Sequence, residues 1–148
     1  MLAAHPGSGG KQKNWPAARF AELMAGCARK WGRVLAPRWL LICGPADEQV
    51  CQEVLNFLAA PVGAAAKEHP VIPRLVRGVS LVHLAAILAA CKGYVGNDSG
   101  VTHIAAAVGT PTLAVFGPTD PKIWGPVGPN VRTVPPRLPA IASATAGQ

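Results

Sequence analysis

The chain has 148 residues, half of them apolar and only 14% charged. This length fits one domain with a sizeable core, and the composition excludes a wholly disordered chain. The net charge of +7 favours anionic partners, but the basic residues are scattered and form no aromatic-rich stripe of the kind that binds nucleic acid. A phosphate-bearing small molecule is therefore the expected partner, and nucleic acid is not.

The four cysteines stand far apart in apolar surroundings, with no CxxC pair and no Cys/His cluster of zinc spacing. They are interpreted as free thiols of a protein from a reducing compartment. No apolar run reaches the about 20 residues that span a bilayer, and nothing resembles a signal peptide. A cytoplasmic protein without a bound metal or cofactor is expected.

Short apolar runs alternate with amphipathic stretches along the chain, which predicts a Rossmann-like α/β fold with a parallel sheet and helices on both faces. Pro73 within the third strand indicates either an edge strand or a brief one. The domain is expected to span residues 1–134, and residues 135–148, which have no periodic apolar face, to form a disordered tail. The predicted strands are 1–5, 38–43, 71–76, 94–96 and 112–116, and the predicted helices are 16–31, 47–58, 81–91 and 101–108.

The helical periodicity also predicts which side chains pack on the sheet. The inward faces of the first three helices are expected to include Trp31, Phe57 and Leu81. Gly32 is expected to end the first helix, and Ser80 to cap the third.

A glycine-rich basic loop, HPGSGGKQK, follows the first strand. A strand, a glycine loop and a helix in this order let backbone amides approach a phosphate. Gln12, however, stands where a Walker A loop needs Ser or Thr after Lys11, and also where a dinucleotide-binding motif needs its third glycine. Taken alone, the loop fits a flexible basic turn equally well.

The motif GNDSG lies between the fourth strand and the fourth helix. In one interpretation, Asp98 or Ser99 only caps the helix. In the other, the amides of Ser99, Gly100 and Val101 hold a phosphate at the positive end of the helix dipole, while Asp98 accepts from a sugar hydroxyl. His103, one turn further on, either donates to a phosphate oxygen or has a structural role.

Taken together, HPGSGG with KNWP, GNDSGVTHIAAAVGTP and FGPTDP resemble the ADP-heptose–lipopolysaccharide heptosyltransferases of glycosyltransferase family 9, over residues 5–128. The resemblance implies a GT-B enzyme that transfers heptose from ADP-heptose to the lipopolysaccharide inner core, with inversion and without a metal. Only the C-terminal, donor-binding half of that architecture is matched. The catalytic base is therefore expected in an N-terminal domain, and this chain is expected to be an excised donor-binding domain that is inactive alone and carries no catalytic residue.

The resemblance also implies the roles of individual residues. Lys13 matches the lysine that meets the donor phosphates, with Gly7 and Ser8 in the loop beside it. Glu48 matches an acidic residue on the adenosine ribose, and Val79 an apolar residue that packs on the adenine. The donor-binding Asp-Ser/Thr-Gly-x-x-His segment is matched by Asp98, Ser99, Gly100, Val101 and His103.

Lys11 competes with Lys13 for the phosphate role, and the spacing to Trp15 favours Lys13. The chain has no Asp-x-Asp pair to hold a metal on the diphosphate. Lys13 and the helix start after Gly100 would then stabilise the leaving group. The lipid-linked acceptor would bind the N-terminal domain, with peripheral contact at the inner face of the cytoplasmic membrane.

Two other functions remain open. The chain is alternatively the nucleotide-sugar-binding domain of another GT-B transferase or of an epimerase, or a non-catalytic nucleotide-binding module. The joint presence of Lys13, Glu48, Asp98 and His103 argues against the module.

Overall fold

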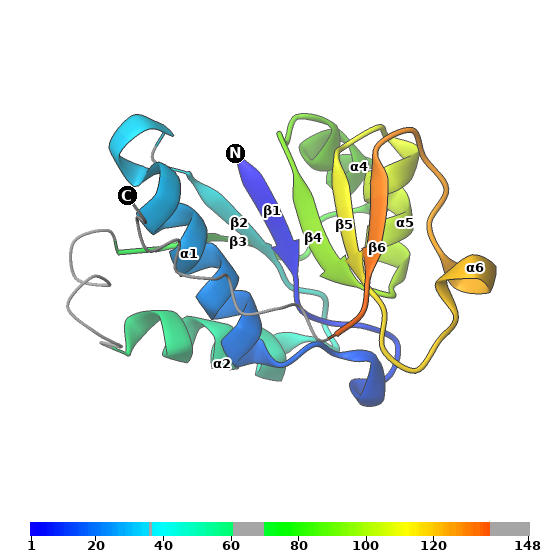
Figure 1. Cartoon of the computed structure of the whole chain (residues 1–148), viewed down its shortest axis with the longest axis horizontal. Helices are drawn as coiled ribbons and strands as arrows, with labels where there is room; N and C mark the ends of the chain where they lie inside the picture. Colours follow the sequence, from blue (N-terminus) through cyan, green and yellow to red (C-terminus); the bar gives the residue numbers. More distant parts are fainter. Residues whose placement is uncertain (36, 61–69, 137–148) are drawn as a thin grey trace, which may run out of the picture.

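The structure is a parallel six-stranded sheet with helices on both faces (Figure 1). The computed structural model describes residues 1–35, 37–60 and 70–136. The strands are β1 (Leu2–His5), β2 (Trp39–Ile42), β3 (Arg74–Val76), β4 (Tyr94–Asn97), β5 (Thr112–Val115) and β6 (Val131–Val134). The helices are the 3-10 turn η1 (Lys11–Lys13) and α1 (Ala17–Leu35), α2 (Glu48–Ala59), α4 (Leu81–Ala89), α5 (Gly100–Ala107) and α6 (Pro121–Trp124).

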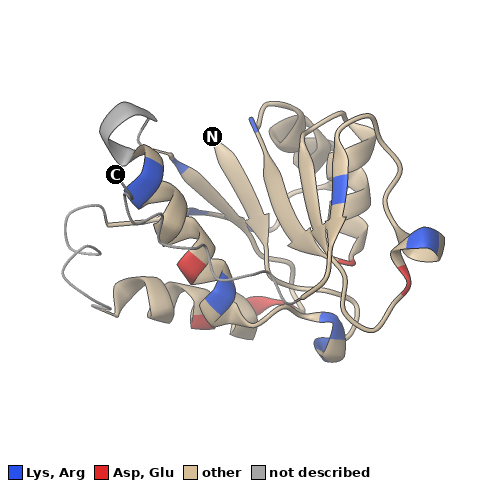
Figure 2. Cartoon of the chain, viewed as in Figure 1, with Lys and Arg blue, Asp and Glu red and all other residues tan. Residues whose placement is uncertain are grey.

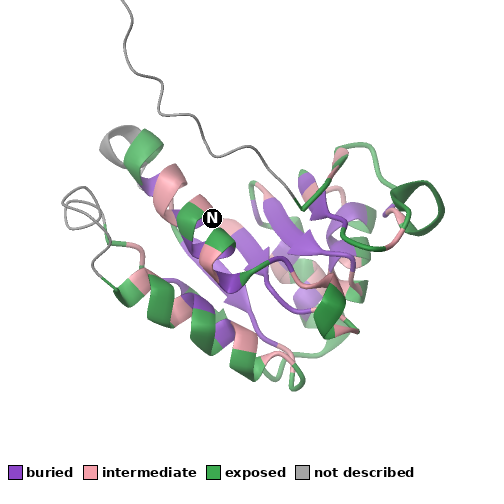
Figure 3. Ribbon diagram, turned by 60° about the horizontal axis from the view of Figure 1, so that its bottom comes forward, coloured by how far each residue is buried: buried purple, intermediate pink, exposed green. Residues whose placement is uncertain are grey.

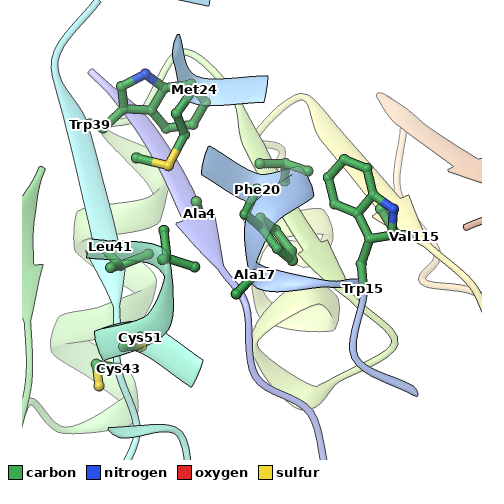
Figure 4. Close-up of a cluster of buried hydrophobic side chains, with 12 residues drawn as sticks. Ala4, Trp15, Ala17, Phe20, Met24, Trp39, Leu41, Cys43, Cys51 and Val115 are labelled. Carbon is green, nitrogen blue, oxygen red and sulfur yellow. The ribbon is translucent and has the colours of Figure 1, made fainter. Parts of the chain in front are cut away.

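Both faces of the central sheet are buried, because helices cover each face and successive strand residues point to opposite sides. Figure 3 shows the central strands β1, β2, β4 and β5 as the most deeply buried layer. On one face, Ala4 and Leu41 pack with Phe20 of α1 and Val54 of α2. Figure 4 shows this cluster, in which Trp15 meets Phe20 edge to face with ring centroids 5.0 Å apart. On the other face, the core residues of the strands, α4 and α5 are Ala3, Leu40, Ile42, Tyr94, Leu84, Leu88 and Ala105.

In the strand order β3-β2-β1-β4-β5-β6, successive strands are added on one side from β1 to β3 and on the other side from β4 onward. The switch point of the sheet therefore lies between β1 and β4. In open α/β sheets, ligands bind at such a switch point, outside the carboxyl ends of the strands. Here His5 at the end of β1 pairs with Gly96 near the end of β4. In Figure 1 this edge is the lower one, to which the strand arrows point and beside which η1 lies.

The five predicted strands and the parallel α/β fold are confirmed. As Pro73 predicts, β3 is an edge strand, and it begins directly after the proline. The other edge strand, β6 at Val131–Val134, was missed. None of its four residues is fully buried, and the sequence VRTV contains no apolar run from which a strand could be predicted.

Three side chains expected to face the core are exposed: Trp31 by 42%, Phe57 by 47% and Leu81 by 69%. Helix α1, about 28 Å long at 1.5 Å per residue, is longer than the strands, which span about 13 Å. Near its end, Trp31 lines a cavity with Leu2 and Trp39 at the amino ends of the strands and stays partly exposed. In α2 the buried stripe runs through Cys51 and Val54, which turns Phe57 outward. Leu81 opens α4 at the rim of a cavity described below.

The predicted helix ends were partly right. Ser80 caps α4, because its hydroxyl accepts a hydrogen bond from the His83 amide at 3.3 Å. Helix α1, in contrast, passes through Gly32 and ends at Leu35. A glycine inside a helix costs only about 0.5–1 kcal/mol relative to alanine, so Gly32 does not stop it.

All four cysteines are free thiols, as expected. Across the described ranges, none of the helices is both long enough and apolar enough to cross a membrane. The predicted tail lies outside the described residues from residue 137 onward. At its start, the Trp15 indole donates to the carbonyl of Pro136 at 2.8 Å.

The positions of two phenylalanines give a matched pair of variants. Phe20→Ala empties a fully buried site and should lower the free energy of unfolding by about 3–5 kcal/mol. Phe57→Ala removes an exposed ring and should change it by no more than about 0.5 kcal/mol. Urea denaturation followed by circular dichroism measures both, and similar losses in the two variants would contradict this assignment of the core.

Candidate functional site

A cavity of about 530 Å³ opens at the carboxyl edge of the sheet, at the switch point between β1 and β4. One part of its lining is polar and comes from the loops after β1, β2 and β4. The other part is apolar and comes from β2, β3, α4, α5 and the loop that leads into α4. The polar side chains are His5, Ser8, Asp47 and Ser99, and the apolar ones include Ile42, Val76, Val79, Leu81, Leu84, Val101 and Ile104.

A histidine at the end of β1 joins two of these loops. His5 is only 4% exposed. Its Nε2 lies 3.0 Å from Asp47 Oδ2, and its Nδ1 lies 3.2 Å from Ser99 Oγ. The hydrogen bond to His5 lowers the pKa of the Asp47 carboxyl, against the opposing effect of burial. Asp47 is thus a carboxylate at neutral pH, held under the cavity.

Two glycines make room for that carboxylate. A Cβ on Gly7 would overlap the Asp47 carboxylate, and one on Gly44 would come within 2.8 Å of its Oδ2. The loops after β1 and β2 therefore meet at Asp47.

A second contact holds the glycine loop to β4. The fully buried Asn97 donates through Nδ2 to the Pro6 carbonyl at 2.7 Å and accepts through Oδ1 from the Trp15 amide at 2.9 Å. Both ends of the loop are therefore fixed to the same side chain.

A lysine–aspartate pair lies beside the cavity. Asp98 Oδ2 accepts from Lys13 Nζ at 2.9 Å and from the Thr119 hydroxyl at 2.8 Å. The side chain of Asp98 is 8% exposed and that of Lys13 is 30% exposed, so solvent reaches the cation more than the carboxylate. Lys11, the alternative phosphate ligand, is exposed on the same 3-10 turn. Figure 2 shows the basic residues of this turn at the carboxyl edge of the sheet.

The start of α5 faces the cavity through Gly100 and Val101. The first amides of a helix have no partner within it. Ser99 occupies the capping position, but its hydroxyl accepts no hydrogen bond from a backbone amide of the helix, and Asp98 is engaged by Lys13 and Thr119. Neither side chain therefore makes a capping hydrogen bond to the helix, and among the described residues no side chain accepts from its first amides. Such amides lie at the positive end of the helix dipole.

The sequence-predicted site residues divide into those that line the cavity and those around it. The cavity is lined by Ser8, Val79, Ser99, Gly100 and Val101. The remaining five lie outside the lining: Gly7 under Asp47, Lys13 and Asp98 in their ion pair, Glu48 exposed on the first turn of α2, and His103 exposed on α5. No group of three His, Cys, Asp or Glu side chains that could hold a metal occurs in the part of the chain that the structure describes.

Four polar residues at this edge had no predicted site role: His5, Asp47, Asn97 and Thr119. His5, Asn97 and Thr119 lie in the motifs HPGSGG, GNDSG and FGPTDP, and Asp47 opens the predicted helix 47–58. The signal was their position at the end of a strand or in the loop that follows one, where polar side chains of neighbouring parallel strands converge.

The profile of glycosyltransferase family 9 (heptosyltransferase) matches residues 1–144. The chain belongs to this family. It is 40% identical over 117 residues to lipopolysaccharide heptosyltransferase 1 of Pseudomonas aeruginosa, covering 78% of this chain and 28% of that protein. It is 31% identical over 125 residues to lipopolysaccharide heptosyltransferase 2 of Salmonella typhimurium, covering 84% and 33%.

Solved family 9 structures share the fold. The ADP-heptose lipopolysaccharide heptosyltransferase II of Escherichia coli superposes with a TM-score of 0.70 at 28% identity, covering 90% of this chain and 38% of that one. The E. coli heptosyltransferase WaaC with ADP-2-deoxy-2-fluoro heptose gives a TM-score of 0.65 at 25% identity, covering 95% and 37%. The family 9 domain described here thus spans about a third of the length of these relatives.

The packing of Asp47 against the glycine loop can be tested with two alanine variants. In Gly7→Ala the new methyl group displaces the carboxylate from His5, so the variant should lose about 1.5–3 kcal/mol of stability, the usual worth of a charged hydrogen bond. Gly9→Ala is the control, because no atom lies within 4 Å of its added Cβ. Denaturant titration measures both, and a Gly7→Ala variant as stable as Gly9→Ala would refute the packing.

Proposed function

We propose that this chain binds the nucleotide-sugar donor of a lipopolysaccharide heptosyltransferase, and that the donor is ADP-heptose. The observation that carries the proposal is the cavity at the β1–β4 switch point, in which a free helix start adjoins an apolar wall. A free helix start can hold a diphosphate, and an apolar wall can pack against a purine base. Family membership and the relative solved with ADP-2-deoxy-2-fluoro heptose support the same ligand class.

In this proposal the amides of Gly100 and Val101 meet the diphosphate, assisted by Lys13. Lys13 contacts Asp98, but an ammonium group has three donors and can hold a phosphate oxygen at the same time. His103 approaches from the second turn of α5 and adds a donor to the phosphates. Gly7 and Ser8 form the loop that faces them.

Asp98 is assigned to the heptose. Lys13 and Thr119 both contact its Oδ2, which leaves Oδ1 to accept a sugar hydroxyl. The adenine is assigned to the apolar side, on Val79, and the ribose to Glu48 at the start of α2. The exposed Val79 and Leu81 provide apolar surface for the base to cover.

The transfer itself is proposed to be inverting and metal-independent. When the bond from heptose to the diphosphate breaks, Lys13 and the amides of α5 stabilise the negative charge on the leaving ADP. The base that takes the acceptor proton is assigned to the part of the relatives' length that this chain does not span. The chain alone should therefore bind the donor without turning it over.

We place the whole enzyme in the cytoplasm, with peripheral contact at the inner membrane face where the lipid-linked acceptor lies. That contact is assigned to the acceptor-binding part of the enzyme.

Calorimetric titration with ADP, UDP and GDP tests the proposed donor. ADP should bind more tightly than UDP or GDP, because the apolar side of the cavity is assigned to adenine. Tighter binding of UDP would favour another nucleotide sugar, and no binding of any of the three at millimolar concentration would refute donor binding by this chain.

Lys13→Ala should weaken ADP binding by about 1.5–3 kcal/mol, or about 10- to 150-fold, through loss of one charged contact. Lys11→Ala, on the same exposed turn, is the matched control and should leave the affinity within about twofold. Thermal melts of both variants separate loss of binding from loss of folding. The reverse order of effects would give the phosphate role to Lys11.

A further inference from the structure

We infer that His5 is a positioning residue that sets the direction of the Ser99 hydroxyl, so that the anionic donor binds together with a proton taken up by His5. This inference rests on the proposed function. It adds His5 to the donor site, together with the proton that His5 takes up when the donor binds.

The first step is the direction of the bond between His5 and Asp47. A carboxylate can only accept hydrogen bonds, so the Nε2 atom of His5, 3.0 Å from Asp47 Oδ2, carries a proton. In a neutral imidazole the other nitrogen is then an acceptor. His5 Nδ1 therefore accepts from the Ser99 hydroxyl, 3.2 Å away.

The second step concerns the other neighbour of Ser99. Thr102 donates its hydroxyl proton to the Asn97 carbonyl. Its oxygen then accepts from the Tyr94 phenol at 2.9 Å and lies 3.2 Å from Ser99 Oγ. While His5 is neutral, neither His5 Nδ1 nor Thr102 Oγ1 has a proton to give to Ser99, and His5 Nδ1 accepts the Ser99 proton. The Ser99 proton points inward, and lone pairs face the cavity.

This arrangement is poor for a phosphate, because two acceptors would meet. If His5 takes a proton from solvent onto Nδ1, that N–H donates to Ser99 Oγ. The Ser99 proton is then free to turn to a ligand oxygen. One proton enters, no other covalent bond changes, and Ser99 becomes a donor at the start of α5.

Charge acts in the same direction. His5 is buried, and the charged group that faces it is Asp47, so a neutral His5 leaves an uncompensated carboxylate beneath a site proposed for a diphosphate. Tyr94 stays neutral, since burial raises the pKa of its phenol. Asp98 is already compensated by Lys13. A protonated His5 would compensate the negative charge of Asp47. Binding of the anionic donor and protonation of His5 therefore each make the other more favourable.

Calorimetric titration with ADP-heptose, whose diphosphate does not titrate near neutral pH, tests this coupling. Titrations in buffers of different ionisation enthalpy measure the protons taken up per donor bound. The wild-type chain should take up a substantial fraction of one proton per donor bound. Its affinity should fall as the pH rises, by at most about tenfold per unit for a single proton.

His5→Gln keeps an amide donor for Asp47 but cannot take up a proton. We expect it to bind with no proton uptake and with an affinity that is nearly independent of pH. His83→Gln is the control and should keep the uptake, since His83 is exposed and bonded to Ser80 at 2.9 Å, outside the cavity. If His5→Gln keeps the uptake while His103→Gln loses it, the proton belongs to His103 and the inference is wrong.

A measurement without ligand separates this inference from the proposed function. Imidazole ¹⁵N shifts should show neutral His5 protonated at Nε2, and Asp47→Asn should weaken that preference. An Nδ1-protonated His5 would overturn the inference whatever binds. Donor binding without proton uptake would also overturn it while leaving the proposed function intact. Failure to bind any nucleotide, with the Nε2 form present, would refute the proposed function and with it the coupling.

Discussion

The site depends on the buried amide of Asn97. An unpartnered polar group in a core costs about 1–3 kcal/mol, and this side chain satisfies its needs only by binding the loop after β1 at both Pro6 and Trp15. The glycine loop is therefore fixed to the end of β4. That attachment sets where Lys13 meets Asp98 and where His5 meets Ser99.

Around this attachment, each carboxylate near the cavity already has a hydrogen-bond donor before a ligand arrives. Asp47 faces His5, and Asp98 faces Lys13. Because these side chains already have partners, the groups left to select an anion are the first backbone amides of α5, which have no hydrogen-bond acceptor among the described residues. The positive end of that helix is a fixed dipole that requires no side-chain rearrangement to meet an anion.

Much of the fold could be predicted from the sequence, because strand and helix patterns are local. The strands at 38–43 and 112–116 are apolar runs between turns, and each appears in the sheet. The face of a helix that meets the sheet is a tertiary property, however. Phe57 fits the helical period as well as its buried neighbours do and still points to solvent, because α2 is rotated toward Cys51. The side chains of β6 give no strand pattern in the sequence, because this strand is held by backbone pairing with β5 and none of its side chains is fully buried.

The sequence predicts which segments meet at the carboxyl edge of the sheet. It does not predict which side chains there contact one another. Motif resemblance brought out Ser99, Gly100 and Val101, which line the cavity. It gave no reason to join His5 to Asp47, because the local sequence presents one as the end of a strand and the other as the start of a helix. The pairing of Lys13 with Asp98 was equally hidden, since it depends on how the η1 turn lies against β4.

The bonds that build this edge of the sheet span long stretches of chain: His5 to Ser99 is 94 residues apart, Asn97 to Pro6 is 91 and Lys13 to Asp98 is 85. No local segment can form them, so the ligand-binding geometry exists only after β1 and β4 have paired. Closing such loops is slow compared with forming helices. A nucleotide would thus have no partly folded form to recognise, and its full binding free energy would stabilise the native state alone. Assembly of the candidate site therefore requires the pairing of β1 with β4.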